Sequence, residues 1–171
     1  MRESRMYQHT LPNGMVVLGQ SMPWLKTAAF SLQVPAGSVR EPSGQNGLAA
    51  LTCECSERGC GELGNREFLE ATELLGASTN NHVATYSIGY SGSCLHQNLI
   101  PLLRLYAALS QAATLAVEEF DPSQLVCLQE LYSQEDDLPQ QTLRTLRRRY
   151  CGEQLGRWPD GEIGELETIQ Y

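Results

Sequence analysis

Three cysteines that lie close together in the sequence could bind a metal ion as thiolates. They are Cys53, Cys55 and Cys60. The other cysteines, any of which could supply a fourth ligand, are Cys94, Cys127 and Cys151. Structural zinc usually takes paired cysteines spaced C-x-x-C on a turn, whereas the spacing here is C-x-C-x-x-x-x-C. Buried cysteine also acts as a small apolar residue. The sequence therefore leaves open whether a metal binds the Cys53/Cys55/Cys60 cluster.

The first two of these cysteines fall in a helix predicted at residues 47–59, GLAALTCECSERG. Leu48, Leu51 and Cys55 recur at helical spacing and indicate one apolar stripe. Cys53 would point about 200° away from Cys55 on such a helix. We expect the stripe to be buried against a strand at residues 28–34, in which apolar and polar residues alternate.

The remaining elements alternate between pairs of strands and pairs of helices. The predicted order is a hairpin at 6–20, a strand at 26–35, the helix at 47–59, a helix at 66–75 with Asn65 as its N-cap, strands at 78–82 and 84–90, and helices at 99–109, 121–136 and 138–152. The helix at 121–136 is expected to begin on Asp121-Pro122, a typical cap followed by a first-turn proline. This order predicts an α+β domain over residues 1–171, with a largely antiparallel sheet and helices packed on one face.

Charge and hydropathy exclude two classes of partner. The net charge is −8, and nucleic acids or anionic membranes are bound by clustered Lys and Arg. No stretch approaches the roughly 18 apolar residues of a membrane span, and no charged-then-apolar leader opens the chain. We therefore expect a cytoplasmic protein with free thiols, no bound nucleic acid and no membrane span.

Three passages resemble one known family. They are the turn Leu11-Pro12-Asn13-Gly14, the run VPAGSVREPSGQNGLA at residues 34–49, and the segment Glu165-Leu166-Glu167-Thr168-Ile169. Together they resemble the pitrilysin/insulinase family of zinc peptidases, whose relatives include the mitochondrial processing peptidase. The resemblance covers nearly the whole chain and implies a processing-peptidase-like N-terminal domain.

In that family the helix at residues 47–59 carries an inverted zinc motif, H-x-x-E-H. Carried over by position, the first His is Ala50 here, the general base Glu is Cys53, and the second His is Glu54. The family's distal zinc ligand, a Glu on a later helix, corresponds to Glu130. An acidic residue often found seven positions earlier is replaced by Ser123.

The resemblance thus implies a homologue whose catalytic residues are replaced. An alanine methyl group cannot coordinate zinc, so we expect no catalytic residues and no cofactor, with zinc held only by active relatives. The implied role is a scaffold or substrate-enclosing subunit, which pairs with an active zinc peptidase, a second domain or another chain of the same fold; a peptide substrate fits this role. The alternative is a metal-dependent peptidase with a site rebuilt from Cys53, Glu54 and Glu130.

The resemblance also bears on how much of a domain is present. In the family, a helix and a further strand follow the segment that corresponds to residues 165–169. We therefore expect this domain to lack its closing helix and strand. A sheet without its last strand exposes unpaired backbone groups, which favour pairing with another chain.

Overall fold

Three antiparallel strands form the central sheet in the computed structural model, which describes residues 5–171. β3 (Thr27–Val34) pairs with β7 (Ile88–Leu95), and β6 (Ser78–Val83) pairs with the other edge of β7. The register runs from Thr27 opposite Leu95 to Val34 opposite Ile88 on one side of β7. β7 is the most buried of these strands because it has a neighbour on each side.

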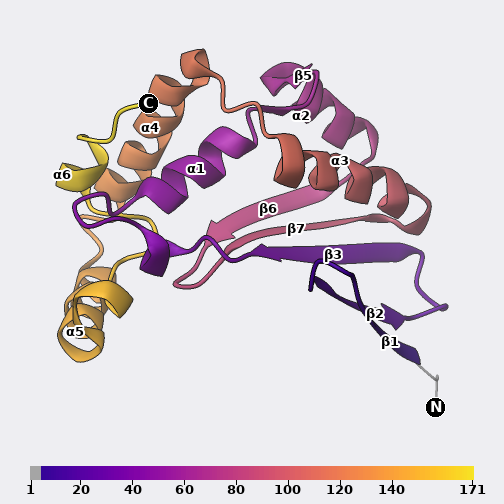
Figure 1. Ribbon diagram of the computed structural model, residues 1–171, viewed down its shortest axis with the longest axis horizontal. Helices are drawn as coiled ribbons and strands as arrows, with labels where there is room; N and C mark the ends of the chain where they lie inside the picture. Colours follow the sequence, from indigo (N-terminus) through magenta and orange to yellow (C-terminus); the bar gives the residue numbers. More distant parts are fainter. Residues whose placement is uncertain (1–4) are drawn as a thin grey trace.

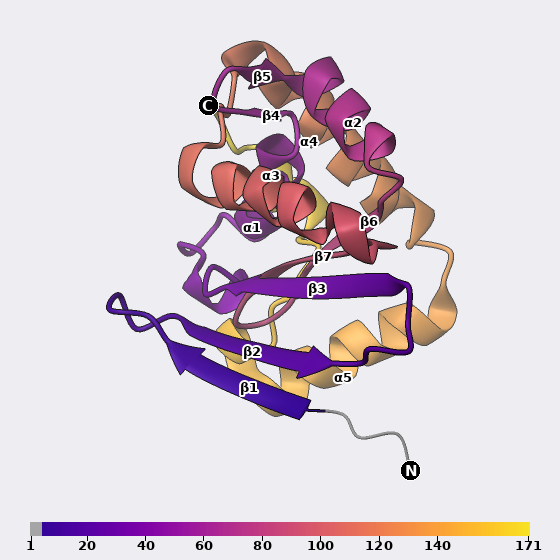
Figure 2. The ribbon, with the colours of Figure 1, turned by 90° about the vertical axis from the view of Figure 1, so that its right-hand side faces the viewer.

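The predicted N-terminal hairpin is present but forms a separate sheet. β1 (Arg5–Thr10) pairs with β2 (Val16–Ser21) across a turn at residues 11–15. Gly14 adopts a φ of 85° in this turn, in the left-handed region that glycine enters without steric cost. β2 then lies alongside β3 without bonding to it (Figure 2). Every residue of β1 is exposed, so the hairpin buries little surface in this chain.

Helices cover one face of the central sheet, which confirms the α+β prediction (Figure 1). On that face lie α1 (Leu48–Ser56), α2 (Asn65–Leu74), α3 (Leu99–Ala112) and α4 (Val117–Ser133). The other elements are η1 (Ser38–Arg40), β4 (Gly59–Cys60), β5 (Leu63–Gly64), η2 (His96–Asn98), α5 (Leu138–Leu155) and α6 (Ile163–Leu166).

Two predicted boundaries are wrong for local reasons. The strand expected at 84–90 begins only at Ile88, because residues 84–87 form the turn that closes β6 onto β7. The helix expected to begin on Asp121-Pro122 begins at Val117, so Pro122 lies inside α4. Because proline has no N–H to donate, α4 lacks one backbone hydrogen bond near its first turn.

The predicted N-cap of α2 is also wrong. Asn65 is the first residue of α2, and its side chain makes no capping bond. Its Nδ2 instead donates to Oε2 of Glu119 at 3.2 Å, which ties α2 to α4.

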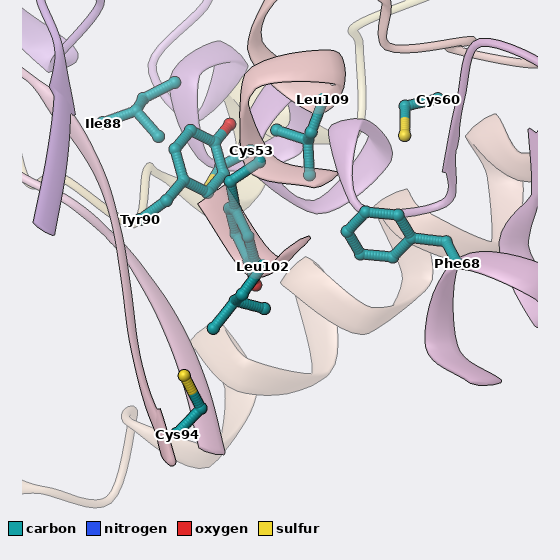
Figure 3. Packing of buried hydrophobic residues seen from close by; sticks show 9 residues of the cluster. Cys53, Cys60, Phe68, Ile88, Tyr90, Cys94, Leu102 and Leu109 are labelled. Carbon is teal, nitrogen blue, oxygen red and sulfur yellow. The ribbon is translucent and has the colours of Figure 1, made fainter. Parts of the chain in front are cut away.

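Two apolar clusters flank α1. The first lies between the sheet and α3 and contains Cys53, Cys60, Phe68, Ile88, Tyr90, Cys94, Leu102, Tyr106 and Leu109 (Figure 3). The second contains Leu51, Cys55, Cys127, Leu131, Leu166 and Ile169, from α1, α4 and the segment that includes α6. α1 thus contributes Cys53 to one cluster and Leu51 with Cys55 to the other.

This arrangement corrects the expected packing of α1. Leu51 and Cys55 are buried, as predicted, whereas Leu48 is only half-buried. Their stripe packs on α4 and α6, and not on the strand at residues 28–34. The opposite side of α1 faces the first cluster, because Cys53 lies about 200° around the helix from Cys55.

Candidate functional site

Glu41, a residue that sequence patterns did not single out, holds the first turn of α1. Its Oε1 accepts hydrogen bonds from the backbone N–H of Gly47 at 3.1 Å and of Ala49 at 2.9 Å. These are free N–H groups of a helix start, which a carboxylate satisfies well. Burial raises the pKa of Glu41, while the two N–H donors and Arg157 oppose that rise. No local pattern predicts this contact, since the carboxylate reaches the helix from across a loop.

The three positions of the degenerate motif have different surroundings. Ala50 and Glu54 are half-buried and one turn apart on the same side of α1. Cys53 is only 3% exposed and belongs to the first apolar cluster, beside Tyr90 (Figure 3). Burial raises the pKa of Cys53 to about 12, so its thiol is protonated at neutral pH and cannot act as a general base.

Two buried hydroxyl groups, those of Ser56 and Tyr90, lie next to Cys53. Ser56 Oγ donates to the carbonyl of Cys53 at 2.7 Å. The Tyr90 hydroxyl lies 2.8 Å from the same Ser56 Oγ. Burial raises the pKa of Tyr90 as well, so the phenol is neutral at physiological pH. The general-base position is therefore filled by a packed, uncharged group.

Arg58 binds the carboxylate of Glu54, the residue predicted at the second ligand position. Its Nε donates to Glu54 Oε1 at 3.2 Å, and its Nη2 donates to the same oxygen. Arg58 Nη1 also lies 3.8 Å from Glu119 on α4. The side chains of all three residues are only about a quarter exposed, at 23% for Arg58 and 26% for each carboxylate. A fixed cation thus compensates Glu54 without a metal.

The structure places Glu54 and Glu130 close enough for their negative charges to interact. Partial desolvation raises the pKa of Glu130, and the negative charges of Asp160 and Glu54 raise it further. Cys127, one turn before Glu130 on α4, is 5% exposed, and burial raises its pKa to about 12. Glu54 and Glu130 are among the charges that act on this thiol.

These residues do not fit a zinc ion. Ala50 offers no donor atom, Cys53 is a buried protonated thiol, and Glu54 is already paired with Arg58. Over residues 5–171 the structure assembles no group of three or more His, Cys, Asp or Glu side chains that could hold a metal. The alternative site built from Cys53, Glu54 and Glu130 therefore lacks a shared point of coordination in the described chain.

The cysteine cluster is likewise dispersed. Cys53 and Cys60 lie in the first apolar cluster, and Cys55 lies in the second. Burial raises the pKa of Cys55 and of Cys60, as it does that of Cys53. All three thiols pack as small apolar groups and do not converge on one point.

A small cavity of about 180 Å³ lies beside Glu54, between α1, α2 and β6. It is smaller than the roughly 300–1,000 Å³ of typical small-molecule pockets. Asn81 on β6 lies close to it and donates to Glu57 Oε2 at 2.6 Å, which joins the end of α1 to the sheet. His82 lies next along β6, opposite Gly89, and alternation along the strand points it to the other face.

Sequence reasoning missed Arg58, Glu119 and the Glu57–Asn81 contact. The spacing of Glu54 and Arg58, four residues apart on a predicted helix, is a signal that could have identified their ion pair. Glu119 and Asn81 carry no such signal, since only tertiary structure brings them to α1.

Comparisons with known proteins show which family this chain resembles. Residues 16–157 match the sequence profile of the family described as Insulinase (Peptidase family M16). A protein of Rickettsia bellii (strain RML369-C) described as an uncharacterized zinc protease is 25% identical over 127 residues, which are 74% of this chain and 31% of that protein. The chain therefore spans about a third of the length of this curated relative.

Two solved structures share the fold. The first is a peptidase M16 inactive domain from Pseudomonas fluorescens, with a TM-score of 0.85, 20% identity, and coverage of 97% of this chain and 41% of that one. The second is a protease from Helicobacter pylori, with a TM-score of 0.86, 20% identity, and coverage of 98% and 41%. Because the family profile spans most of the chain, this chain belongs to the insulinase (peptidase M16) family.

Proposed function

We propose that this chain is a non-catalytic member of its family, which serves as a scaffold or substrate-enclosing subunit. The observation that carries the proposal is the state of the motif on α1. Ala50 has no ligand atom, Cys53 is packed beside Tyr90, and Glu54 is held by Arg58. Hydrolysis by the family's chemistry needs about three metal ligands and a base that can take a proton from bound water.

The proposed partner is a protein chain or domain of the same fold, such as an active zinc peptidase. Two facts support this: the chain spans 41% of the similar Pseudomonas fluorescens structure, and that structure is described as an inactive domain. A peptide held between the two partners is the proposed substrate. We further propose that residues 1–171 form an N-terminal domain that takes its closing helix and strand from outside the described chain.

The proposed location is the cytoplasm. None of the helices in residues 5–171 is long and apolar enough to cross a membrane. The six cysteines, all within the described chain, are free, which suits a reducing compartment.

Metal analysis and a cleavage assay on the purified chain test the proposed function. We expect less than about 0.1 zinc per chain after dialysis, because the donor set is incomplete. Incubation with a mixed peptide library, with and without added zinc, should leave the library intact. Stoichiometric zinc together with cleavage that a chelator abolishes would overturn the proposal and support the site of Cys53, Glu54 and Glu130. An active relative can also be added to the peptide library. If this chain increases the rate at which that relative cleaves the peptides, the result supports the partner role directly.

A further inference from the structure

The small cavity at the end of α1 is lined by both acidic and aromatic side chains. Glu54, Glu57 and Arg58 line it from α1 and the residues that follow this helix. Phe68 of α2 and Tyr106 of α3 also line it. Its volume of about 180 Å³ lies below the roughly 300–1,000 Å³ of pockets for drug-sized ligands, so it suits one side chain or a small amine.

The charged groups in and next to the cavity are mostly negative. Arg58 pairs with Glu54 and also lies 3.8 Å from Glu119. Glu57 forms no ion pair within residues 5–171, and its Oε2 accepts a bond at 2.6 Å from the neutral amide of Asn81. Three carboxylates therefore share one guanidinium, which leaves an excess of negative charge. A cation in the cavity would balance that excess.

One oxygen of each lining carboxylate is available to such a cation. Glu54 Oε1 accepts both bonds from Arg58, and Glu54 Oε2 accepts none from the described residues. Glu57 uses Oε2 for Asn81 and likewise leaves Oε1 without a donor in residues 5–171. Burial raises the pKa of Glu57, and the charge of Glu54 raises it further, while Asn81 and Arg58 oppose the rise. A charged donor nearby would favour the ionised form.

The aromatic part of the lining suits the hydrocarbon stem of a long side chain. Phe68 is 6% exposed and Tyr106 is 2% exposed, and their ring centroids lie 6.1 Å apart in an edge-to-face arrangement. Ring faces attract cations, and the stems of lysine and arginine pack on apolar surface. Leu69 and Thr79 line the cavity and are exposed, so they lie where it meets solvent.

The arrangement of the carboxylates favours an organic cation over a metal ion. Over the described part of the chain, no group of three or more His, Cys, Asp or Glu side chains could hold a metal. Glu54, Glu57 and Glu119 therefore do not converge on one point. An ammonium or a guanidinium needs no such convergence, because each carries several N–H donors that point in different directions.

We propose that this cavity binds the ammonium or guanidinium group of one lysine or arginine side chain, which a peptide supplies. The charged group bonds to Glu57 and to the available oxygen of Glu54, and the stem lies against Phe68 and Tyr106. Glu57 sets the preference for a basic residue. This inference rests on the proposed function of a substrate-enclosing chain, and it names the kind of residue that the enclosed peptide presents.

A pair of peptides tests the proposal on the 171-residue chain. The probe is Ala-Ala-Lys-Ala-Ala with blocked ends, and its control carries norleucine, which keeps the stem and lacks the ammonium. In a titration followed by NMR, we expect the probe to bind with a Kd of about 1 mM or tighter. The control should bind at least fivefold more weakly. The largest shifts should fall in residues 54–58 and 68–72.

A free amine distinguishes the two possible sources of the cation. n-Butylamine carries the same ammonium and stem but no peptide. We expect it to bind at least threefold more weakly than the probe, because it lacks the peptide groups that reach Leu69 and Thr79 at the cavity mouth.

Matched variants show whether binding uses the cavity. Glu57→Gln removes the charge and keeps an acceptor for Asn81, and we expect it to weaken probe binding at least fivefold and to abolish the preference over norleucine. Glu73→Gln removes an equal charge from an exposed position on α2 outside the cavity and should leave binding unchanged. Arg58→Ala removes the competing cation and should tighten binding about threefold. Circular dichroism checks that each variant is folded.

Four results would overturn the proposal. The first is no probe binding up to about 10 mM, and the second is equal binding of the lysine and norleucine peptides. The third is an effect of Glu73→Gln as large as that of Glu57→Gln, which would reduce the effect to net charge. The fourth is butylamine binding as tight as that of the probe, which would assign the cavity to a free amine. None of these measurements involves zinc or hydrolysis, so a failure here is distinguishable from a failure of the proposed function.

Discussion

Arg58 and Glu54, one helical turn apart on α1, form an ion pair in which two guanidinium nitrogens donate to one carboxylate oxygen. Glu54 is the residue that the resemblance to the family assigns to the second zinc-ligand position. Glu119 on α4 lies 3.8 Å from the same guanidinium, so a cation bridges two helices. The guanidinium of Arg58 thus compensates the charges of carboxylates on both helices.

The first prediction concerns the strength of that ion pair. In a double-mutant cycle of Arg58→Ala and Glu54→Gln, we expect a coupling free energy of about 0.5–1 kcal/mol, because both side chains are about three-quarters shielded from water. Arg66 and Glu70 have the same spacing on α2 but are 85% and 54% exposed, and they serve as the control. Their coupling should be about 0.3 kcal/mol. Urea unfolding measures both cycles, and equal couplings would contradict the special role of Arg58.

The second prediction concerns restoration of metal binding. Ala50→His with Glu54→His places two imidazoles one turn apart on α1, near the carboxylate of Glu130. We expect this double variant to bind zinc with micromolar or tighter affinity in isothermal titration calorimetry. Cys53 is left unchanged because its site is apolar and 3% exposed, and a buried glutamate there would destabilise the fold.

The control for this prediction adds Glu130→Gln, which should weaken zinc binding about tenfold or more by removing the third ligand. If the triple variant binds zinc as tightly as the double variant, Glu130 is not the distal ligand position. Thermal unfolding of each variant without metal establishes that the comparison is made between folded proteins.

The third prediction tests the packing of α1 on α4 and α6. Leu51 is 2% exposed within the second apolar cluster, so Leu51→Ala should lower the free energy of unfolding by about 2–5 kcal/mol. Leu74→Ala, at a position 87% exposed, should change it by less than about 0.5 kcal/mol. Chemical denaturation gives both values, and a loss at Leu51 as small as that at Leu74 would place Leu51 outside the core.

The fourth prediction concerns thiol reactivity. Burial raises the pKa of Cys53 and of Cys127 to about 12, so neither forms appreciable thiolate at pH 8. Cys151 is the exposed cysteine among the six, and we expect it alone to react rapidly with Ellman's reagent in the native protein. Cys151→Ser should remove the rapid phase, and unfolding should expose all the remaining thiols. A rapid phase that persists in this variant would show that a core thiol is accessible.

The fifth prediction is a pH dependence set by Glu130. Its pKa is raised in the folded protein by partial desolvation and by Asp160 and Glu54, so its ionised form disfavours folding. This cost is absent below the ordinary value of 4.5 and appears as pH rises through the raised pKa. Glu130→Gln should therefore match the wild type near pH 4 and melt about 1 °C higher at pH 7.

Glu135→Gln provides the control for the pH effect, since it also removes one negative charge near the end of α4. Differential scanning calorimetry between pH 4 and pH 8 compares the variants. A melting difference for Glu130→Gln that does not grow with pH, or that Glu135→Gln reproduces, would contradict the proposed charge cluster.

Local sequence was sufficient to predict most elements of the fold. The alternation at residues 28–34 and the apolar stripe of α1 each express a local preference, and both elements are present. The α+β class follows from the order of these elements. Boundaries were wrong where tertiary contacts override local preferences, as at Pro122 inside α4 and at Asn65, which bonds to α4.

For the candidate site too, some features follow from the sequence and others only from the tertiary structure. The sequence alone determined that Ala50 offers no ligand atom, because residue type decides whether a donor atom exists, and it predicted through the resemblance that Cys53 and Glu54 replace the family's base and second histidine. Only the tertiary structure decided that Cys53 faces the sheet while Leu51 and Cys55 face α4, since periodicity separates the sides of a helix without naming their neighbours. The separation of β2 and β3 into different sheets within residues 5–171 likewise depends on strand pairing, which long-range contacts set.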